Sequence, residues 1–222
     1  MFHQPILGSG SKAASLPEVV SAFSYTLDIA RGRPAGHSVR SCWIGMHIGR
    51  QRSLPAAEMH DLYYVLLLAN SAFGQLHVSP TVAQGIARLG ERWDGSGEPG
   101  QLKGEQIPLT ARIALLAQVA DIAYARSRVA GAVREVKFRS GSWLDPELVE
   151  AFEIVAADDF LWKQLSGPFL DARVAMLAPA EGDPSTLDLL GDITIDLGRM
   201  LRSKSVNSDC VAALRRAGIR TA

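Results

Sequence analysis

The feature that most constrains the fold of this chain is a succession of helix starts, each followed by apolar residues at helical spacing. In "SLPE", Ser15 is placed as an N-cap, Pro17 lies in the first turn and Glu18 completes a capping box. The later starts are marked by Ser53 with Pro55, Ser79 with Pro80, Pro108, and Asp145 with Pro146. "DITID" is the one alternating stretch noted, and it lies inside a helical stripe, so the sequence predicts an all-α protein.

The spacing predicts helices over about residues 16–30, 37–50, 55–70, 80–89, 108–123, 129–138 and 145–152, with shorter helical segments over 156–177. We expect residues 1–15 to be a flexible lead-in and residues 16–177 to form one helical domain. "APAEGDPS" then reads as a linker, so that residues 178–222 form an appendage of linker and C-terminal helices.

The C-terminal appendage carries an apolar stripe at heptad-like spacing. Its members are Leu187, Leu190, Ile193, Leu197, Met200 and Leu201. Such a stripe fits a homodimer contact or a helix that docks on a partner protein. It fits equally well with packing on its own domain, since amphipathicity does not name a partner.

Composition excludes several classes of partner. The 23 Lys and Arg residues balance the 23 Asp and Glu residues, which argues against broad electrostatic capture of DNA or of an anionic membrane. No apolar run reaches the roughly 20 residues that a membrane-spanning helix needs. The two cysteines, Cys42 and Cys210, are far apart in sequence. We therefore expect a reduced, cytoplasmic setting.

The side chains that usually carry chemistry are scattered. The five histidines form no HxH or HExxH motif, and the cysteines lack zinc-ligand spacing. His60 is followed directly by Asp61, but adjacent positions of a helix point apart. The most distinctive stretch is the Gly-rich "ERWDGSGEPGQLKGEQIPLTARI", residues 91–113. Asp94 followed by Gly95 is a turn signal, because Asp caps its own backbone and Gly accepts a positive φ. Glu91 and Asp94 are therefore expected to hold the shape of this loop.

The same stretch resembles the signature loop of HD-GYP domains, a branch of the HD phosphohydrolases. The family loop reads HHExxDGxGYP and continues into Ile-Pro and Ala-Arg-Ile. The matching residues are Glu91, Asp94, Gly95, Gly97, Pro99, Leu102, Gly104, Ile107, Pro108, Ala111, Arg112 and Ile113. "GHSVRSCWIG" resembles the helix that carries the family's first His ligand, and the likeness extends over about residues 19–152.

This resemblance implies an HD-type helical bundle, hydrolysis of cyclic di-GMP and a centre of two or three Fe or Mn ions. The chain departs from the family at ligand and signature positions, where it has Ala69, Asn70, Leu89, Gly90, Glu98 and Gln118. The connection from Asn70 to Glu91 is also shorter than in the family, which implies that a ligand-bearing helix is missing. His37 is then the lone remnant of the site, and we expect no metal and no other cofactor.

Three functions remain open. The first is a catalytically inactive HD-GYP-like module for signalling or protein interaction, in which the loop is a structural latch formed by Glu91, Asp94, Gly95, Gly97 and Pro99.

The second function is a sensor that binds a cyclic dinucleotide without cleaving it. Arg40, Lys103 and Arg112 are the candidates for pairing with phosphate. Arg112 has an alternative role as a clamp on Asp94 or Glu91.

The third function is a metal-dependent phosphodiesterase acting on cyclic di-GMP or a related nucleotide. In that case His37, Glu91, Asp94 and Asp121 must converge.

Overall fold

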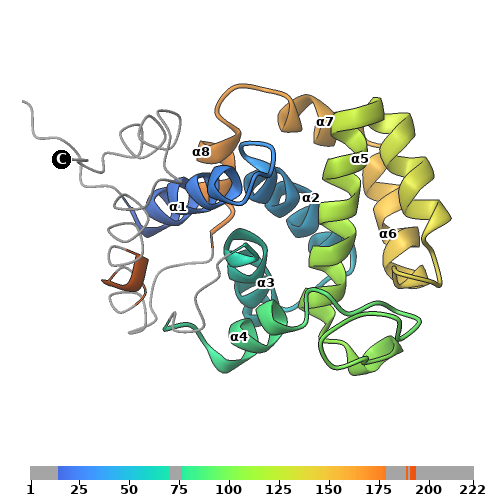
Figure 1. Cartoon of the computed structure of the whole chain (residues 1–222). Helices are drawn as coiled ribbons and strands as arrows, with labels where there is room; N and C mark the ends of the chain where they lie inside the picture. The colour runs from blue at the N-terminus through green and yellow to red at the C-terminus, as the bar shows by residue number, and fades with distance from the viewer. Residues whose placement is uncertain (1–14, 71–76, 179–188, 190, 194–222) are drawn as a thin grey trace, which may run out of the picture.

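The computed structural model describes residues 15–70, 77–178, 189 and 191–193 (Figure 1). In chain order the elements are α1 (Leu16–Ala30), α2 (His37–Gln51), α3 (Ala56–Leu68), α4 (Pro80–Ala87), the 3-10 turn η1 (Gly104–Gln106), α5 (Leu109–Phe138), α6 (Pro146–Ala156), α7 (Asp159–Leu165) and α8 (Leu170–Ala175). These described residues contain no β-strand, so the predicted all-α, HD-like fold is confirmed.

Three of the predicted helix starts, at Ser15, Ser79 and Asp145, carry the expected side-chain contacts. The starts near Pro55 and Pro108 have no side-chain cap. Glu18 closes a capping box on Ser15, with its Oε2 accepting from the Ser15 backbone N–H at 2.8 Å. The Ser79 hydroxyl accepts from the backbone N–H of Val82 and so caps α4. Asp145 caps α6 through the backbone N–H of Glu147. Local sequence therefore determines where these helices begin.

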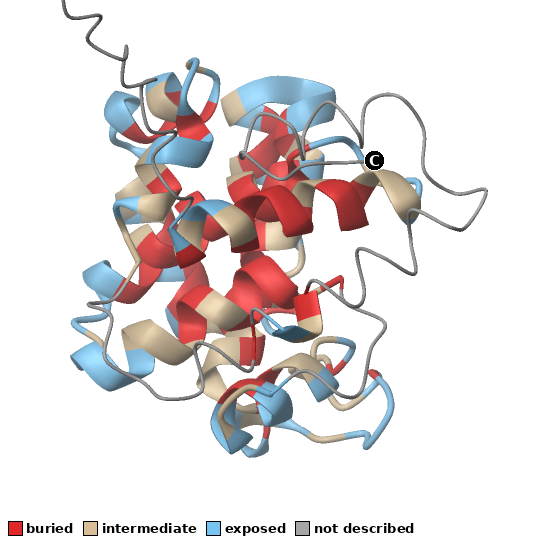
Figure 2. Cartoon of the chain, turned by 90° about the vertical axis from the view of Figure 1, so that its left-hand side faces the viewer, coloured by how far each residue is buried: buried red, intermediate tan, exposed pale blue. Residues whose placement is uncertain are grey.

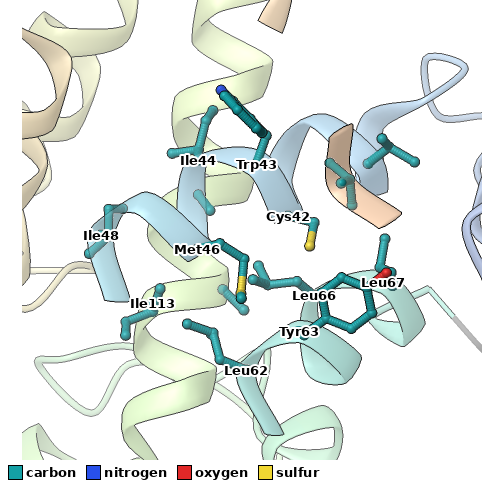
Figure 3. Packing of buried hydrophobic residues seen from close by; sticks show 14 of the residues in the cluster. Cys42, Trp43, Ile44, Met46, Ile48, Leu62, Tyr63, Leu66, Leu67 and Ile113 are labelled. Carbon is teal, nitrogen blue, oxygen red and sulfur yellow. The ribbon is translucent and has the colours of Figure 1, made fainter. Parts of the chain in front are cut away.

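Helix α2 packs against α1, α3, α5 and α6 (Figure 1). Buried residues gather in the middle of the molecule, and exposed ones lie toward its outside (Figure 2). Gly45 and Gly49 let α3 approach α2 closely. A Cβ atom at Gly45 would lie 2.7 Å from a Leu66 methyl group, and one at Gly49 would lie 2.9 Å from Leu62. The buried side chains at this junction include Cys42, Ile44, Met46, Ile48, Leu62, Tyr63, Leu66 and Leu67 (Figure 3). Their burial is the main source of stability, because it removes apolar surface from water.

Helix α5 joins the two helices that the sequence predicts over 108–123 and 129–138. Its backbone departs from helical geometry at Ser127 (φ −141°) and at Arg128 (φ 56°, ψ −158°). The chain then folds back, so that the second part of α5 and α6 lie together beside the first part (Figure 1). The predicted division is therefore present as a sharp bend rather than as a loop.

The bend predicts that a substitution by glycine, which usually destabilises a helical protein, will here stabilise it. Arg128 is exposed and holds a positive φ that L-residues rarely adopt, so Arg128→Gly is expected to raise the free energy of unfolding by about 1 kcal/mol. Arg126→Gly is the matched control, because Arg126 is exposed on the helical part of α5. It is expected to lower the same quantity by about 1 kcal/mol. Urea unfolding of both variants checks this, and destabilisation by both would show that Arg128 is not strained.

The C-terminal stripe is only partly described. Ile193 is fully buried and, with Leu189, belongs to the main core. Asp192 accepts hydrogen bonds from the backbone N–H and the Nδ1 of His77, at 2.5 and 2.9 Å. Leu187, Leu190, Leu197, Met200 and Leu201 lie outside the described residues. The division of the chain at residues 15 and 178 stays a proposal, as does a dimer or partner contact through this stripe.

Within the described ranges, no helix combines the length and the apolar character that crossing a bilayer requires.

Candidate functional site

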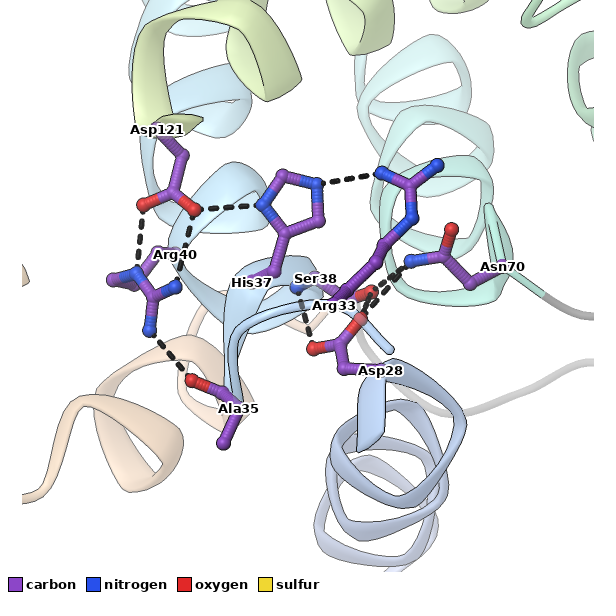
Figure 4. A network of polar contacts seen from close by, with 8 residues as sticks. All are labelled: Asp28, Arg33, Ala35, His37, Ser38, Arg40, Asn70 and Asp121. Atoms are coloured by element: carbon purple, nitrogen blue, oxygen red, sulfur yellow. Dashed lines mark hydrogen bonds and ion pairs between the residues drawn. The ribbon is translucent and has the colours of Figure 1, made fainter. Parts of the chain in front are cut away.

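A network of hydrogen-bonded polar side chains surrounds His37, at the first turn of α2 (Figure 4). His37 is buried, with an exposed side-chain fraction of 1%. Its Nδ1 lies 2.7 Å from Oδ2 of Asp121 on α5, and its Nε2 lies 3.1 Å from Nη1 of Arg33 in the turn between α1 and α2. Arginine can only donate, so Nε2 accepts and Nδ1 carries the hydrogen that it donates to Asp121. The imidazole is thereby held in one tautomer.

Asp121 also binds Arg40, which lies one turn after His37 on α2. Arg40 donates from Nε to Oδ1 at 2.6 Å and from Nη2 to Oδ2 at 3.1 Å, the two-pronged geometry that favours guanidinium–carboxylate pairs. Its Nη1 donates to the carbonyl of Ala35 at 2.8 Å. Both oxygens of the buried Asp121 carboxylate are therefore occupied. Arg40, a predicted phosphate contact, is the partner of that carboxylate.

A second carboxylate, Asp28 of α1, caps the start of α2 from outside that helix. It accepts from the backbone N–H of Ser38 at 2.9 Å and from its hydroxyl at 2.7 Å. The side-chain amide of Asn70 donates to Asp28 at 3.0 Å and to the Ser38 hydroxyl at 2.9 Å. Burial raises the pKa of Asp28, and the hydrogen bonds from Ser38 oppose this in part.

These contacts give Asn70 a specific role at a position where the family has an aspartate. Its Nδ2 is a donor to Asp28, and an ionised aspartate has no hydrogen to donate. An aspartate at position 70 would also place a second carboxylate against Asp28. Asparagine at position 70 is therefore compatible with the neighbouring Asp28.

The Gly-rich loop is organised by its own acidic residues. Glu91 is buried and accepts from the backbone N–H groups of Gly100 at 2.6 Å and Leu102 at 3.0 Å. Asp94 accepts from the backbone N–H of Ser96 at 2.9 Å. Hydrogen bonding by the side chain and the backbone of Ser96 lowers the pKa of Asp94. A Cβ atom at Gly97 would lie 2.5 Å from the Gly90 carbonyl oxygen, so the loop closes tightly there. Gly95 takes a φ of 85°, as its turn position requires.

The four residues that the phosphodiesterase hypothesis brings together fall into two groups. His37 and Asp121 are in direct contact, whereas the carboxylates of Glu91 and Asp94 accept from backbone N–H groups of the loop. Glu91 also lies beside Arg88, just before the loop. Asp121 also lies about three turns, or roughly 18 Å, along α5 from Leu109, where that helix begins. Pro99 lies in this loop and is exposed.

Two of the three predicted phosphate contacts lie in or beside the loop. Arg112 donates to Oδ2 of Asp145 at 2.6 Å. The prediction that Arg112 clamps Asp94 or Glu91 is therefore wrong, because its partner is Asp145. This contact ties the first turn of α5 to the cap of α6. The Lys103 side chain is exposed, and its backbone N–H donates to Gln106. Arg33 is absent from the predicted contacts, although it lies close to His37 in "RGRPAGH".

Comparisons with known proteins agree on the family. Residues 48–148 match the model of the HD domain. A solved structure of a cyclic GMP-AMP-specific phosphodiesterase of Vibrio cholerae superposes with a TM-score of 0.75 and 30% identity, covering 84% of this chain and 60% of that one. These matches support an HD-GYP-like phosphohydrolase family for this chain. His37 lies before residues 48–148, the range that matches the HD-domain model.

Curated relatives extend the comparison. The chain is 29% identical to a 3'3'-cGAMP-specific phosphodiesterase of V. cholerae over 270 residues, which cover 86% of this chain and 59% of the relative. It is 40% identical to a cyclic di-GMP phosphodiesterase of Thermotoga maritima over 68 residues, which cover 28% of this chain and 18% of the relative. This HD-GYP-like chain therefore spans about 60% of the length of the first of these.

The 270 aligned positions exceed the 222 residues of this chain. The Vibrio relative therefore has residues within the aligned region that have no counterpart here. This agrees with the short connection between Asn70 and Glu91.

The expectation of a protein without a metal cofactor is wrong. The relatives are HD-domain phosphodiesterases, a metal-dependent class of enzyme, and the comparisons give no sign of a metal-free protein. His37 has the orientation of a metal-binding histidine, with one nitrogen on a carboxylate and the other presenting a lone pair. Among the described residues, however, no group of three or more His, Cys, Asp or Glu side chains is placed to hold a metal. The described residues alone therefore do not supply the set of ligands that a two-metal centre needs.

Proposed function

We propose that this HD-GYP-like chain recognises a cyclic dinucleotide at the His37 cluster, here defined as His37, Arg33, Arg40 and Asp121, and acts on it as an HD-type phosphodiesterase. The observation that carries the proposal is the likeness, over 84% of the chain, to a cyclic GMP-AMP-specific phosphodiesterase. A cyclic dinucleotide presents two phosphodiester anions, and guanidinium groups are suited to bind them. Hydrolysis on this proposal requires metal ligands in addition to His37.

A second candidate is a signalling module that binds the nucleotide and does not hydrolyse it. Two features favour this candidate. Arg33 donates a hydrogen bond to the Nε2 of His37, and His37 and Arg40 together occupy both oxygens of Asp121. His37 and Asp121 are thus satisfied by neighbours within the protein, and among the described residues no group of three or more His, Cys, Asp or Glu side chains is placed to hold a metal. Catalytic inactivity stays a prediction.

One experiment decides between the two. The purified chain is titrated with 3'3'-cGAMP and with cyclic di-GMP in a calorimeter. The same mixtures are incubated with and without manganese and analysed for linear products by chromatography. We expect saturable binding, and product formation that depends on manganese. Binding without product selects the signalling module, whereas neither binding nor product contradicts both candidates.

A further inference from the structure

Arg33 differs from Arg40 and Arg112, two of the predicted phosphate contacts, in what balances its charge. Arg40 is paired with Asp121, and Arg112 with Asp145. Within the described part of the chain, no carboxylate lies within ion-pair distance of Arg33, whose side chain makes its hydrogen bond to the imidazole of His37. A guanidinium gains less from a neutral acceptor than from an anion.

The turn that carries Arg33 holds it in a defined place. The backbone N–H of Arg33 donates to the carbonyl of Asp28 at 2.8 Å, and that of His37 donates to Pro34 at 3.0 Å. Gly32 and Gly36 take φ values of 66° and 75°, which lets the chain reverse tightly on either side. The guanidinium lies beside the Nε2 edge of the His37 imidazole, at the start of α2 (Figure 4). Its Nε and Nη2 make no hydrogen bond with the described residues, so they are available to a ligand.

We propose that Arg33 binds a phosphodiester of the cyclic dinucleotide, and that in doing so it leaves the Nε2 of His37. This inference rests on the proposed function. A phosphodiester offers the anion that Arg33 lacks, and two of its oxygens match the guanidinium fork. Once Arg33 has moved, the lone pair on Nε2 faces the bound nucleotide, while Asp121 continues to hold Nδ1. Arg33 is thus a ligand-binding residue that also covers His37 when no nucleotide is present.

The test compares Arg33→Met with Arg31→Met and Arg33→Lys. Arg31 lies two residues earlier and is exposed, so its replacement removes the same charge without touching His37. We expect Arg33→Met to weaken the binding of 3'3'-cGAMP at least roughly 10-fold, the loss expected for a charged hydrogen bond. Arg31→Met is expected to stay within about twofold of wild type, and Arg33→Lys to recover part of the affinity. Equal affinities for both methionine variants overturn the inference.

A second measurement needs no turnover. The ¹⁵N resonance of His37 Nε2 is recorded in wild type, in wild type with 3'3'-cGAMP and in Arg33→Met. We expect the nucleotide and the substitution to shift it in the same direction, because both remove the donor. A nucleotide that binds without shifting this resonance overturns the release of His37 by Arg33. A wild-type chain that fails to bind any cyclic dinucleotide contradicts instead the proposed function on which the inference rests.

Discussion

Asp121→Ala is expected to lower the free energy of unfolding by about 3–5 kcal/mol, the largest effect that we predict for a single substitution. The carboxylate is 1% exposed and binds both His37 and Arg40. Its removal leaves a guanidinium that is 21% exposed without its anion, and leaves the Nδ1–H of a buried imidazole without an acceptor. The measurement is the urea midpoint of unfolding, with the slope compared between variants to confirm that the transition is unchanged in kind.

The control for Asp121 is another arginine–carboxylate pair in the same protein. Arg52 and Glu147 lie 2.7 Å apart, but their side chains are 40% and 69% exposed. Water screens such a pair, so Glu147→Ala is expected to change stability by at most about 1 kcal/mol. If Asp121→Ala costs no more than Glu147→Ala, the His37 cluster does not stabilise the fold, and its burial has to be explained by function alone.

Glu91→Gln is expected to lower the free energy of unfolding by about 2–3 kcal/mol and to release the Gly-rich loop. The ionised side chain accepts from two backbone N–H groups, those of Gly100 and Leu102, and lies 3.4 Å from Nη1 of Arg88. A glutamine has one acceptor oxygen, so its amide group would face a backbone donor. Hydrogen exchange of the Gly100 and Leu102 amides measures the local release, because both exchange faster once the loop opens.

Glu98→Gln is the matched control for Glu91, because it makes the same chemical change at an exposed residue of the same loop. It is expected to alter stability by no more than about 0.5 kcal/mol. If Glu91→Gln abolishes nucleotide turnover without changing stability or exchange, the latch role of Glu91 is wrong and a catalytic role replaces it. Equal exchange rates in the two variants would also contradict the latch.

The helices could be predicted because their determinants are local. Ser15 with Glu18, Ser79 and Asp145 cap helices within a few residues of themselves, and a single sequence contains all of that information. The bend at Ser127 and Arg128 carries no proline or glycine signal of its own. The sequence therefore predicts two helices there without revealing that they meet at a sharp bend with no loop between them.

The contacts of the site could not be predicted in the same way. His37 and Asp121 are 84 residues apart, and the sequence does not say which buried carboxylate an imidazole meets. In the sequence, Asn70 stands where the resemblance implies an aspartate ligand. Its role as a hydrogen-bond donor to Asp28 is visible only in the fold, which brings α1 and the end of α3 together. Arg112 was expected to bind an acid of its own loop and binds Asp145 instead. In each case, tertiary packing selects among several chemically equivalent partners.

The central claim is that a cyclic dinucleotide binds at the His37 cluster. The most direct test is a map of backbone amide chemical shifts during titration of the ¹⁵N-labelled chain with 3'3'-cGAMP. The account predicts saturable shifts in the turn that carries Arg33, in the first turn of α2 and around Asp121 on α5. Shifts confined to the Gly-rich loop, or no shifts at nucleotide concentrations that saturate a known phosphodiesterase of this family, would contradict it.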